Sequence, residues 1–299
     1  MGNKRLIKFF IFATCVVSVF LGMASTVSAQ GTATLKGLTL SPLRTELNLS
    51  PGTSINGYLK ITNSTDKPMT VDLNAEEFKV INPQYDYEFI AESGVARWVS
   101  FEPSEVIIKA GASKKVKYTV GAPLTAELGG YYISMFASAA VGSPGDAGNS
   151  QQRLASLLYI TVSSDVLGAV TRAGHILSLS SPWLMVDKGA WGITIQNGGT
   201  THFRSDYSVK IEDLFGGKVS DNQNSALILP NTIRAISGEL PSPSIPGIYK
   251  VIYTVGLGDT PSVVETHYML FLPIWAITII TAVIVACGYR LYRKMYKKR

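Results

Sequence analysis

Hydrophobic and polar residues alternate along most of the chain between residues 30 and 266. In "LRTELNLS", which begins at Leu43, every second residue is leucine or threonine, and "SINGYLKIT", which begins at Ser54, alternates in a similar way. A period of two is typical of antiparallel strands that bury one face. The pattern therefore predicts strands, and no long amphipathic helix, in this region. Further strands are expected at Met69–Phe78, Tyr87–Ala91, Glu105–Lys109, Lys114–Val120, Tyr131–Ala140 and Leu154–Val162.

Three sequence landmarks occur twice in the same order. "KITN" at 60–63 is matched by "TIQN" at 194–197, and "VIIKAGASKKVKYTV" at 106–120 by "ALILPNTIRAISGEL" at 226–240. "GGYYISMF" at 129–136 is matched by "PGIYKVIY" at 246–253, which pairs Tyr132 with Tyr249. The repeat predicts two similar domains, and about seven short strands per domain favour an immunoglobulin-like sandwich. An accidental resemblance between two β-rich halves is the alternative.

The predicted fold class is all-β, with two tandem immunoglobulin-like β-sandwich domains followed by a single transmembrane α-helix. The first domain is the larger, because it adds the hairpin "NPQYDYEFIAES" and a strand after a Gly/Ser-rich loop. The expected segments are a signal peptide at 1–29, a first domain at 30–164, a second domain at 165–266, the transmembrane helix at 267–289 and a basic cytoplasmic tail at 290–299.

The beginning of the chain has the pattern of a secretory signal peptide. Lys4, Arg5 and Lys8 precede an apolar run at 9–23, and the small residues of "VSA" follow. We expect cleavage before Gln30, so that the region after it is exported.

A second apolar run, at 268–289, is free of charge over the roughly 20 residues that a membrane-spanning helix needs. Aromatic residues suit the membrane interfaces, and positive charge stays on the cytoplasmic side. The sequence therefore predicts a single-pass protein of the cell membrane, with extracellular domains and a cytoplasmic C-terminus. The expected anchor residues are Trp275, Tyr289, Arg290, Arg293 and Lys294.

This topology changes the meaning of the net charge of +6. Three of the 27 cations lie in the expected signal peptide and six in the tail, and neither segment holds an acid, so the region between them carries 18 cations and 21 acids. Such a balance gives no support for a nucleic-acid partner. Cys15 and Cys287 fall in the signal peptide and the helix, so we expect neither disulfides nor thiolate metal sites in the exported region.

The exported region offers no familiar catalytic motif. His175, His202 and His267 are widely spaced, without a neighbouring acid in a known pattern. Ser64 and Lys67 have the Ser-x-x-Lys spacing, but that motif acts from a helix, and here it falls in a predicted turn. We therefore predict that the protein is not an enzyme and expect no cofactor.

Acidic residues near the added hairpin are a weak candidate for a metal site. Glu76, Glu77, Asp86 and Glu88 could approach one another across the hairpin. They lack the spacing of a calcium-binding loop, so a solvated acidic edge is the favoured interpretation and no metal is expected.

Aromatic residues give the candidate surface for a ligand or partner. Tyr85, Tyr87 and Phe89 occupy alternate positions of the hairpin and are expected to share one face. Such a stripe could grip a glycan ring or a partner strand, whereas a flap that covers the core is the favoured alternative. We expect the tryptophans in the core or between the domains, at Trp98, Trp183 and Trp191.

Three segments carry a resemblance to a known family. They are "LSPLRTELNLSPGTSINGYLKITNSTDKPMTV" at 40–71, "VIIKAGASKKVKYTVGAP" with the following "GGYYISMF", and "GIYKVIYTV" with "FLPIW" before the expected helix. With its two-domain plan, the chain resembles the WxL-interacting cell-surface proteins of monoderm bacteria. The resemblance implies that the first domain binds peptidoglycan and that the second holds secreted WxL proteins at the surface. It assigns no contact residues, because no binding motif of the family matches position by position.

These features favour a non-enzymatic, membrane-anchored cell-surface scaffold that binds a cell-wall polymer, peptidoglycan, or a secreted surface protein. One alternative is a chaperone-like assembly protein that donates a strand edge, expected at Leu154–Val162, to exported subunits. A passive surface stalk is the other alternative.

Overall fold

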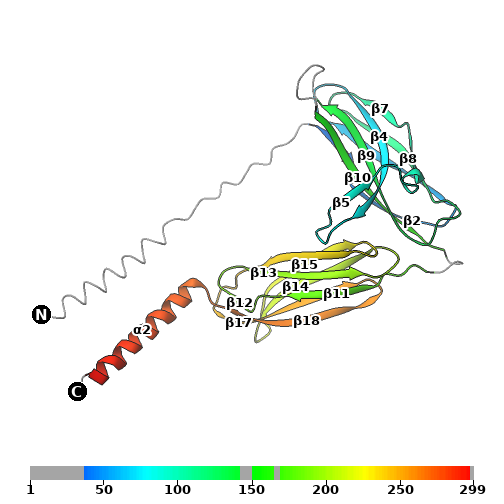
Figure 1. Cartoon of the computed structure of the whole chain (residues 1–299). Helices are drawn as coiled ribbons and strands as arrows, with labels where there is room; N and C mark the ends of the chain where they lie inside the picture. Colours follow the sequence, from blue (N-terminus) through cyan, green and yellow to red (C-terminus); the bar gives the residue numbers. More distant parts are fainter. Residues whose placement is uncertain (1–36, 142–149, 165–168, 297–299) are drawn as a thin grey trace. The chain divides into compact units, whose positions relative to one another are not determined.

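The computed structural model describes residues 37–141, 150–164 and 169–296, which form strands and one long helix (Figure 1). Residues 37–299 belong to one compact unit. The expected signal peptide, with Cys15, and the last three residues of the tail lie outside the described residues.

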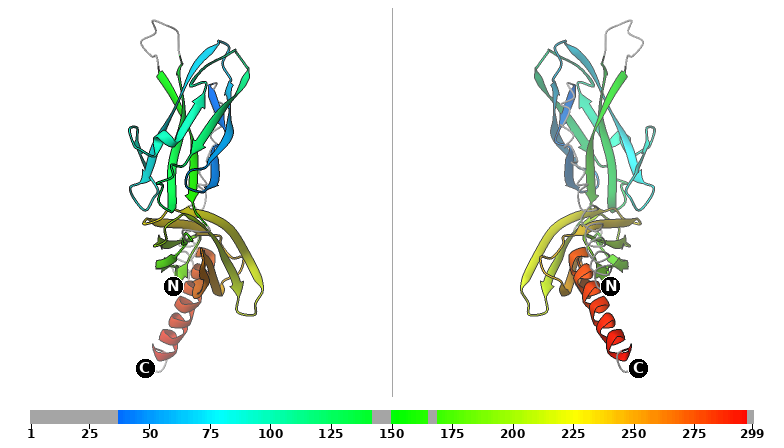
Figure 2. Two further views of the ribbon diagram at one scale, coloured as in Figure 1. Left: turned by 90° about the vertical axis from the view of Figure 1, so that its right-hand side faces the viewer. Right: turned by 90° about the vertical axis from the view of Figure 1, so that its left-hand side faces the viewer.

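The first immunoglobulin-like sandwich packs two sheets face to face (Figure 2). One sheet has the order β1-β3-β8-β6, formed by β1 (Leu38–Ser41), β3 (Ser54–Asn63), β8 (Ser113–Gly121) and β6 (Val99–Glu102). The other has the order β2-β10-β9-β4-β5, formed by β2 (Arg44–Leu49), β10 (Ser150–Val162), β9 (Gly129–Val141), β4 (Met69–Val80) and β5 (Tyr87–Ile90). Strand β7 (Glu105–Ile108) also pairs with β4, and the short helix η1 (Ala96–Trp98) precedes β6.

Alternating side chains make the core of this sandwich. On β3, Leu59 and Ile61 are fully buried, whereas the alternating Tyr58 and Lys60 face outward. Burying one such aliphatic side chain contributes about 1.5–3 kcal/mol. The largest fully buried side chains of this core are Leu59, Ile61, Ile108, Ile133, Met135, Leu158 and Ile160.

The second sandwich follows the same plan with fewer strands. Its smaller sheet has the order β11-β13-β16, formed by β11 (Gly174–Ser180), β13 (Gly189–Asn197) and β16 (Ile233–Leu240). Its larger sheet has the order β12-β18-β17-β14-β15, formed by β12 (Leu184–Met185), β18 (Thr260–Phe271), β17 (Gly247–Leu257), β14 (Phe203–Asp213) and β15 (Lys218–Ile228). A second, separate core fills the space between these sheets.

Tyr131 and Tyr249 mark equivalent positions of the two sandwiches. Each is the third residue of its strand, and each hydroxyl donates a hydrogen bond to the carbonyl oxygen four residues earlier, at 2.9 Å to Glu127 and 2.6 Å to Ile245. The sequence match that pairs Tyr132 with Tyr249 is therefore wrong by one residue. Because neighbouring side chains on a strand point to opposite faces, this slip matters: Tyr131 packs on the first core and Tyr132 on another cluster.

The long helix is α2, Ile274–Tyr296, and it starts directly after Pro273. It is the one helix among the described residues that is long and apolar enough to cross a membrane. Its expected bounds, 267–289, are wrong at both ends. His267–Phe271 continue β18, because the alternation persists there with Met269 and Phe271 buried. The basic residues that follow Tyr289 extend the helix, because Arg and Lys are good helix formers.

Candidate functional site

The predicted aromatic stripe does not form one exposed face. Tyr85 is 7% exposed and lies in a turn with a φ of 70°, outside β5. Tyr87 packs edge-on against Phe78 with ring centroids 5.1 Å apart, and Phe89 packs edge-on against Phe136 at 5.0 Å. The stripe thus covers apolar residues, as the flap alternative expects, and Tyr85 is excluded from a surface that could meet a ligand. The positive φ of Tyr85 breaks the alternation on which the prediction depended.

Tyr85 instead contacts the second sandwich. Its hydroxyl oxygen accepts the backbone N–H of Leu229 at 2.8 Å and lies 2.8 Å from the Thr232 hydroxyl. The Arg234 guanidinium lies over the ring, 4.3 Å from its centroid. Burial raises the pKa of Tyr85, so the hydroxyl keeps its proton. Tyr85 is therefore a structural contact between the two sandwiches.

An apolar cluster and several hydrogen bonds complete this junction. The buried members of the cluster are Phe78, Tyr85, Tyr159, Leu227 and Leu229. Backbone hydrogen bonds run from Gly130 N–H to the Thr200 oxygen, at 2.9 Å, and from Ala235 N–H to the Pro83 oxygen, at 2.8 Å. The junction therefore holds the two sandwiches together by burial of apolar side chains as well as by hydrogen bonding.

His202 lies at the junction and is only 8% exposed. Its Nδ1 is 3.3 Å from the Tyr132 hydroxyl, and its ring packs near the ring of Tyr159. Burial lowers the pKa of His202 to about 4, so the imidazole is neutral at pH 7. Its role is packing, and sequence spacing alone does not reveal it.

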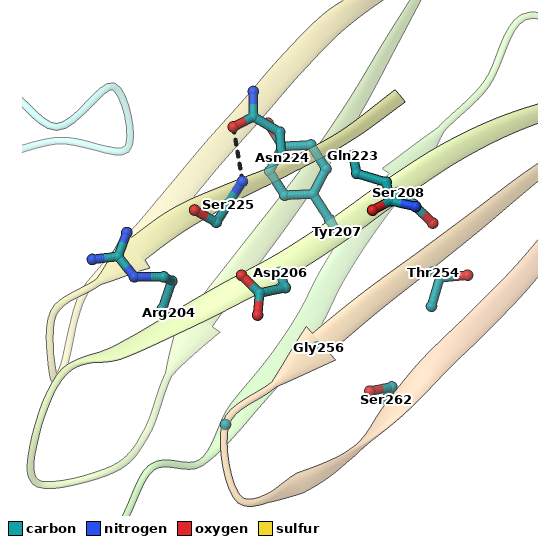
Figure 3. A pocket seen from close by; sticks show the side chains of 11 residues that line it. Arg204, Asp206, Tyr207, Ser208, Gln223, Asn224, Ser225, Thr254, Gly256 and Ser262 are labelled. Carbon is teal, nitrogen blue, oxygen red and sulfur yellow. Dashed lines mark hydrogen bonds between the residues drawn. The ribbon is translucent and has the colours of Figure 1, made fainter. Parts of the chain in front are cut away.

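A polar groove runs across the outer face of the larger sheet of the second sandwich (Figure 3). It has a volume of about 810 Å³. The side chains of Arg204, Asp206 and Ser208 alternate along β14 and share the groove face. The other polar lining residues are Gln223, Asn224, Ser225, Thr254 and Ser262.

The lining of the polar groove offers hydrogen-bond donors and acceptors, and Tyr207 is the one aromatic member among the described residues that line it (Figure 3). Tyr207 lies between Asp206 and Ser208 in sequence, but its ring packs against the second core, 5.9 Å from Trp191. At one end, Arg204 forms an ion pair with Glu46 of the first sandwich, at 2.6 Å. A mixture of hydroxyls, amides, one carboxylate and one guanidinium suits a polar, neutral ligand such as a sugar chain.

A free strand edge lies on the first sandwich. Strand β10 pairs with β9 over Ser150–Val162, but with β2 only over Leu157–Val162. The expected free edge, Leu154–Val162, is thus wrong for most of its length. The parallel pairing of β2 covers it, because the chain crosses from the first sheet to the second after β1. Among the described residues, 150–156 pair with a strand through the backbone on one side only, and the Ser156 hydroxyl donates to the oxygen of Pro42, between β1 and β2, at 2.7 Å.

The direction of the N–H groups along this edge follows from one contact. The N–H of Leu157 donates to the Leu43 oxygen at 2.9 Å, on the β2 side. Successive peptide groups of a strand point to opposite sides, so the N–H groups of Arg153 and Ala155 point to the same side as that of Leu157. The Arg153 side chain is held by an ion pair with Glu76 and by stacking over Phe136.

The other candidate residues do not come together in a catalytic or metal-binding site in the part of the chain that the structure describes. Ser64 and Lys67 lie in the turn between β3 and β4, and Glu76 pairs with Arg153. The described residues hold no group of three or more side chains suited to a metal ion. Trp191 is buried and Trp98 packs against Tyr131, but Trp183 is 74% exposed, so its expected burial is wrong.

The predicted anchor residues lie at both ends of α2. Trp275 is exposed in the first turn, Tyr289 is exposed near the far end, and Arg293 and Lys294 lie in the last turn. This is the distribution expected of a helix with one aromatic and one basic membrane boundary.

Comparison with known proteins gives a similarity of fold only. No family model and no curated protein matches the chain. Solved structures that match include a class 5 fimbriae chaperone, CfaA, with 13% identity, a TM-score of 0.41, and coverage of 77% of this chain and 98% of that chain. Another is the Pseudomonas aeruginosa CupB2 chaperone, with 11% identity, a TM-score of 0.38, and coverage of 78% and 100%. Identities and TM-scores this low have no bearing on function.

Proposed function

We propose that the protein is a non-enzymatic, membrane-anchored surface protein that binds a segment of another exported protein as an added strand on β10. Helix α2 crosses the membrane once. The two sandwiches lie outside, and the basic end of α2 with its Arg290, Arg293 and Lys294 lies at the cytoplasmic boundary. The resemblance to WxL-interacting proteins supports a secreted protein as the partner.

This proposal depends on the edge of β10, which β2 covers only over Leu157–Val162. The outward N–H groups of Arg153 and Ala155 are followed directly by the stretch where β2 already pairs. A partner strand would continue the line of β2 and satisfy these groups, which is how peptides add to sheet edges. Because β2 runs parallel to β10, a partner strand that also runs parallel would form the same pattern of hydrogen bonds with β10 as β2 does.

A proline at position 155 tests strand addition. Ala155→Pro removes one outward N–H and leaves the bonds between β10 and β9 in place, since edge strands tolerate proline at such positions. Ala155→Ser keeps the N–H and is the matched control. We expect the full-length chain and the Ala155→Ser variant to co-purify with the same exported protein, and the Ala155→Pro variant to lose it. Equal retention by the Ala155→Pro variant contradicts the proposal.

A second function, binding of a cell-wall polymer, is favoured by the polar groove. Its hydroxyls, amides and Asp206 match the donors and acceptors of a glycan. We expect Asp206→Ala to reduce retention of the full-length protein on cell-wall sacculi several-fold, whereas Asp221→Ala, on the same sheet outside the groove lining, leaves it unchanged. The family resemblance implies that the first domain binds peptidoglycan. Unchanged retention of Asp206→Ala would therefore indicate that the polymer binds the first domain and not the polar groove. A passive stalk would retain neither polymer nor protein.

A further inference from the structure

The end of the second sandwich nearest to α2 exposes several large apolar side chains. Phe215 is 100% exposed, Trp183 74% and Ile245 69%. Scattered apolar residues are normal on a protein surface, but a group of them at one place marks an interaction site. We call this group the apolar rim, and its members are Trp183, Leu214, Phe215, Ile245, Ile248 and Tyr268.

Strand pairing places the members of the apolar rim at the same end of the sheet. Asp213 pairs with Tyr249, and Tyr249 pairs with Met269. Leu214 and Phe215 follow Asp213 directly, so they lie level with Ile248 and Gly247, which pair with Leu270 and Phe271. On the other side of β18, the N–H of Leu270 donates to the Trp183 oxygen at 2.8 Å.

The turn that carries Phe215 is held in one conformation. The Asp213 carboxylate oxygen Oδ1 accepts the N–H of Phe215 and the N–H of Gly217, both at 2.8 Å. Gly216 has a φ of 86°, which suits glycine. The turn tip, at the end of the yellow hairpin in Figure 2, therefore presents Phe215 to the surroundings, and the side chain contributes nothing to the core.

The short connection between β18 and α2 fixes where this end lies. The strand ends at Phe271 and the helix begins at Ile274. Three residues span at most about 10 Å, and the headgroup layer on each side of the hydrocarbon core is about 5–8 Å thick. When α2 crosses a bilayer, the end of β18 thus lies within about 10 Å of the start of the helix, and the apolar rim lies at that same end of the sheet. Trp, Tyr and Phe are the residues that favour the depth of the lipid headgroups.

We propose that the apolar rim inserts into the headgroup and upper acyl region of the same bilayer that α2 crosses, and so seats the second sandwich on the membrane. The proposal rests on the membrane anchoring proposed above. The lipid surface is the occupant because the chain itself brings it to the rim, whereas a second copy or another protein would have to arrive from outside.

Depth-dependent fluorescence quenching of the full-length protein in phosphatidylcholine nanodiscs tests this proposal. With Cys15 and Cys287 replaced by serine, an environment-sensitive dye is attached at Phe215→Cys or, as the matched control, at Asn224→Cys on exposed β15. A third sample, with Cys15 alone replaced, carries the dye on native Cys287 within α2. Lipids with a nitroxide near the headgroup or deep in the acyl chain supply the quencher.

We expect the dye at position 215 to be quenched at least two-fold more by the shallow nitroxide than the dye at position 224, with emission shifted to the blue. If the deep nitroxide quenches the Cys287 dye but neither nitroxide quenches the dye at 215, the insertion of the apolar rim is contradicted, whereas the crossing of the membrane by α2 is supported. A Cys287 dye that no nitroxide quenches overturns both. A blue-shifted but unquenched dye at 215 shows that protein covers the rim, and also overturns the proposal.

Discussion

Asn197 forms in the second sandwich the same set of hydrogen bonds that Asn63 forms in the first. Both are fully buried at the last position of a strand. Each amide nitrogen donates to the carbonyl four residues later and to a carbonyl at the end of a distant strand, and each amide oxygen accepts the N–H two residues later. The partners are Lys67, Ile108 and Thr65 for Asn63, and Thr201, Ile228 and Gly199 for Asn197.

Replacing either asparagine by alanine should destabilise its sandwich strongly. Asn63→Ala leaves buried carbonyl groups without a donor, and a single unsatisfied buried group costs about 1–3 kcal/mol. We expect a loss of roughly 2–4 kcal/mol in the free energy of unfolding for Asn63→Ala and for Asn197→Ala, measured by denaturant titration in detergent. The exposed control Asn222→Ala should stay within about 0.5 kcal/mol. A similar small change in Asn63→Ala would show that water replaces the amide.

Removal of the Tyr85 hydroxyl should loosen the junction. Tyr85→Phe keeps the ring over Arg234 but leaves the Leu229 N–H without its acceptor. We expect hydrogen exchange at the Leu229 amide to speed up at least ten-fold, together with a loss of about 1–2 kcal/mol in stability. Tyr58→Phe, at an exposed tyrosine, is the control and should change neither. Unchanged exchange at Leu229 would mean that the hydroxyl is not what protects it.

Stability should depend on pH through His202. Burial lowers the pKa of its folded form from 6.5 to about 4, so the unfolded chain binds a proton in this range while the folded chain does not. The free energy of unfolding is therefore unaffected by the protonation of His202 above pH 6.5. It decreases as the pH falls towards 4, by up to roughly 3 kcal/mol. We expect His202→Gln to flatten the stability profile between these values. If the free energy of unfolding of His202→Gln depends on pH as steeply as that of the unchanged protein, other groups cause the dependence.

Close packing at Gly238 should make it intolerant of even one methyl group. A Cβ there would lie 2.7 Å from the indole ring of Trp191, which is rigid and 8% exposed. Gly238→Ala should therefore cost about 1–3 kcal/mol and change the tryptophan fluorescence. Gly94→Ala is the matched control, because nothing lies within 4 Å of its Cβ position. Equal melting curves for the two variants would contradict this packing.

Local patterns predicted most of the strands and the register of the repeat. Ile108 and Ile228, which the sequence match pairs, both accept a bond from the buried asparagine of their sandwich. The match failed only where two tyrosines stand side by side, at 131 and 132, because sequence alone does not say which of them faces the core. The end of β18 was missed for a related reason, since an apolar strand that joins an apolar helix offers no change of composition.

The candidate surfaces were less predictable, because they depend on contacts between distant segments. Tyr85 was expected on a surface, but its hydroxyl accepts the N–H of Leu229, which lies 144 residues later and directly follows β15. The polar groove has no motif, since its lining comes from four strands of unremarkable polar sequence. Trp183 was expected inside because tryptophan usually is; its exposure follows from the position of β12 at the end of the sheet.

The path of the chain through the second sandwich determines how it responds to force. Ala173 bridges to Gly258, at the turn between β17 and β18, while Phe271 at the other end of β18 leads to α2. The chain thus enters at one end of the strands and leaves at the opposite end. With α2 anchored in a membrane as proposed above, tension between the first sandwich and α2 would pull along β18, so its hydrogen bonds to β17 would be loaded together in shear. A sandwich held in this way resists mechanical extension better than one whose strands peel apart bond by bond.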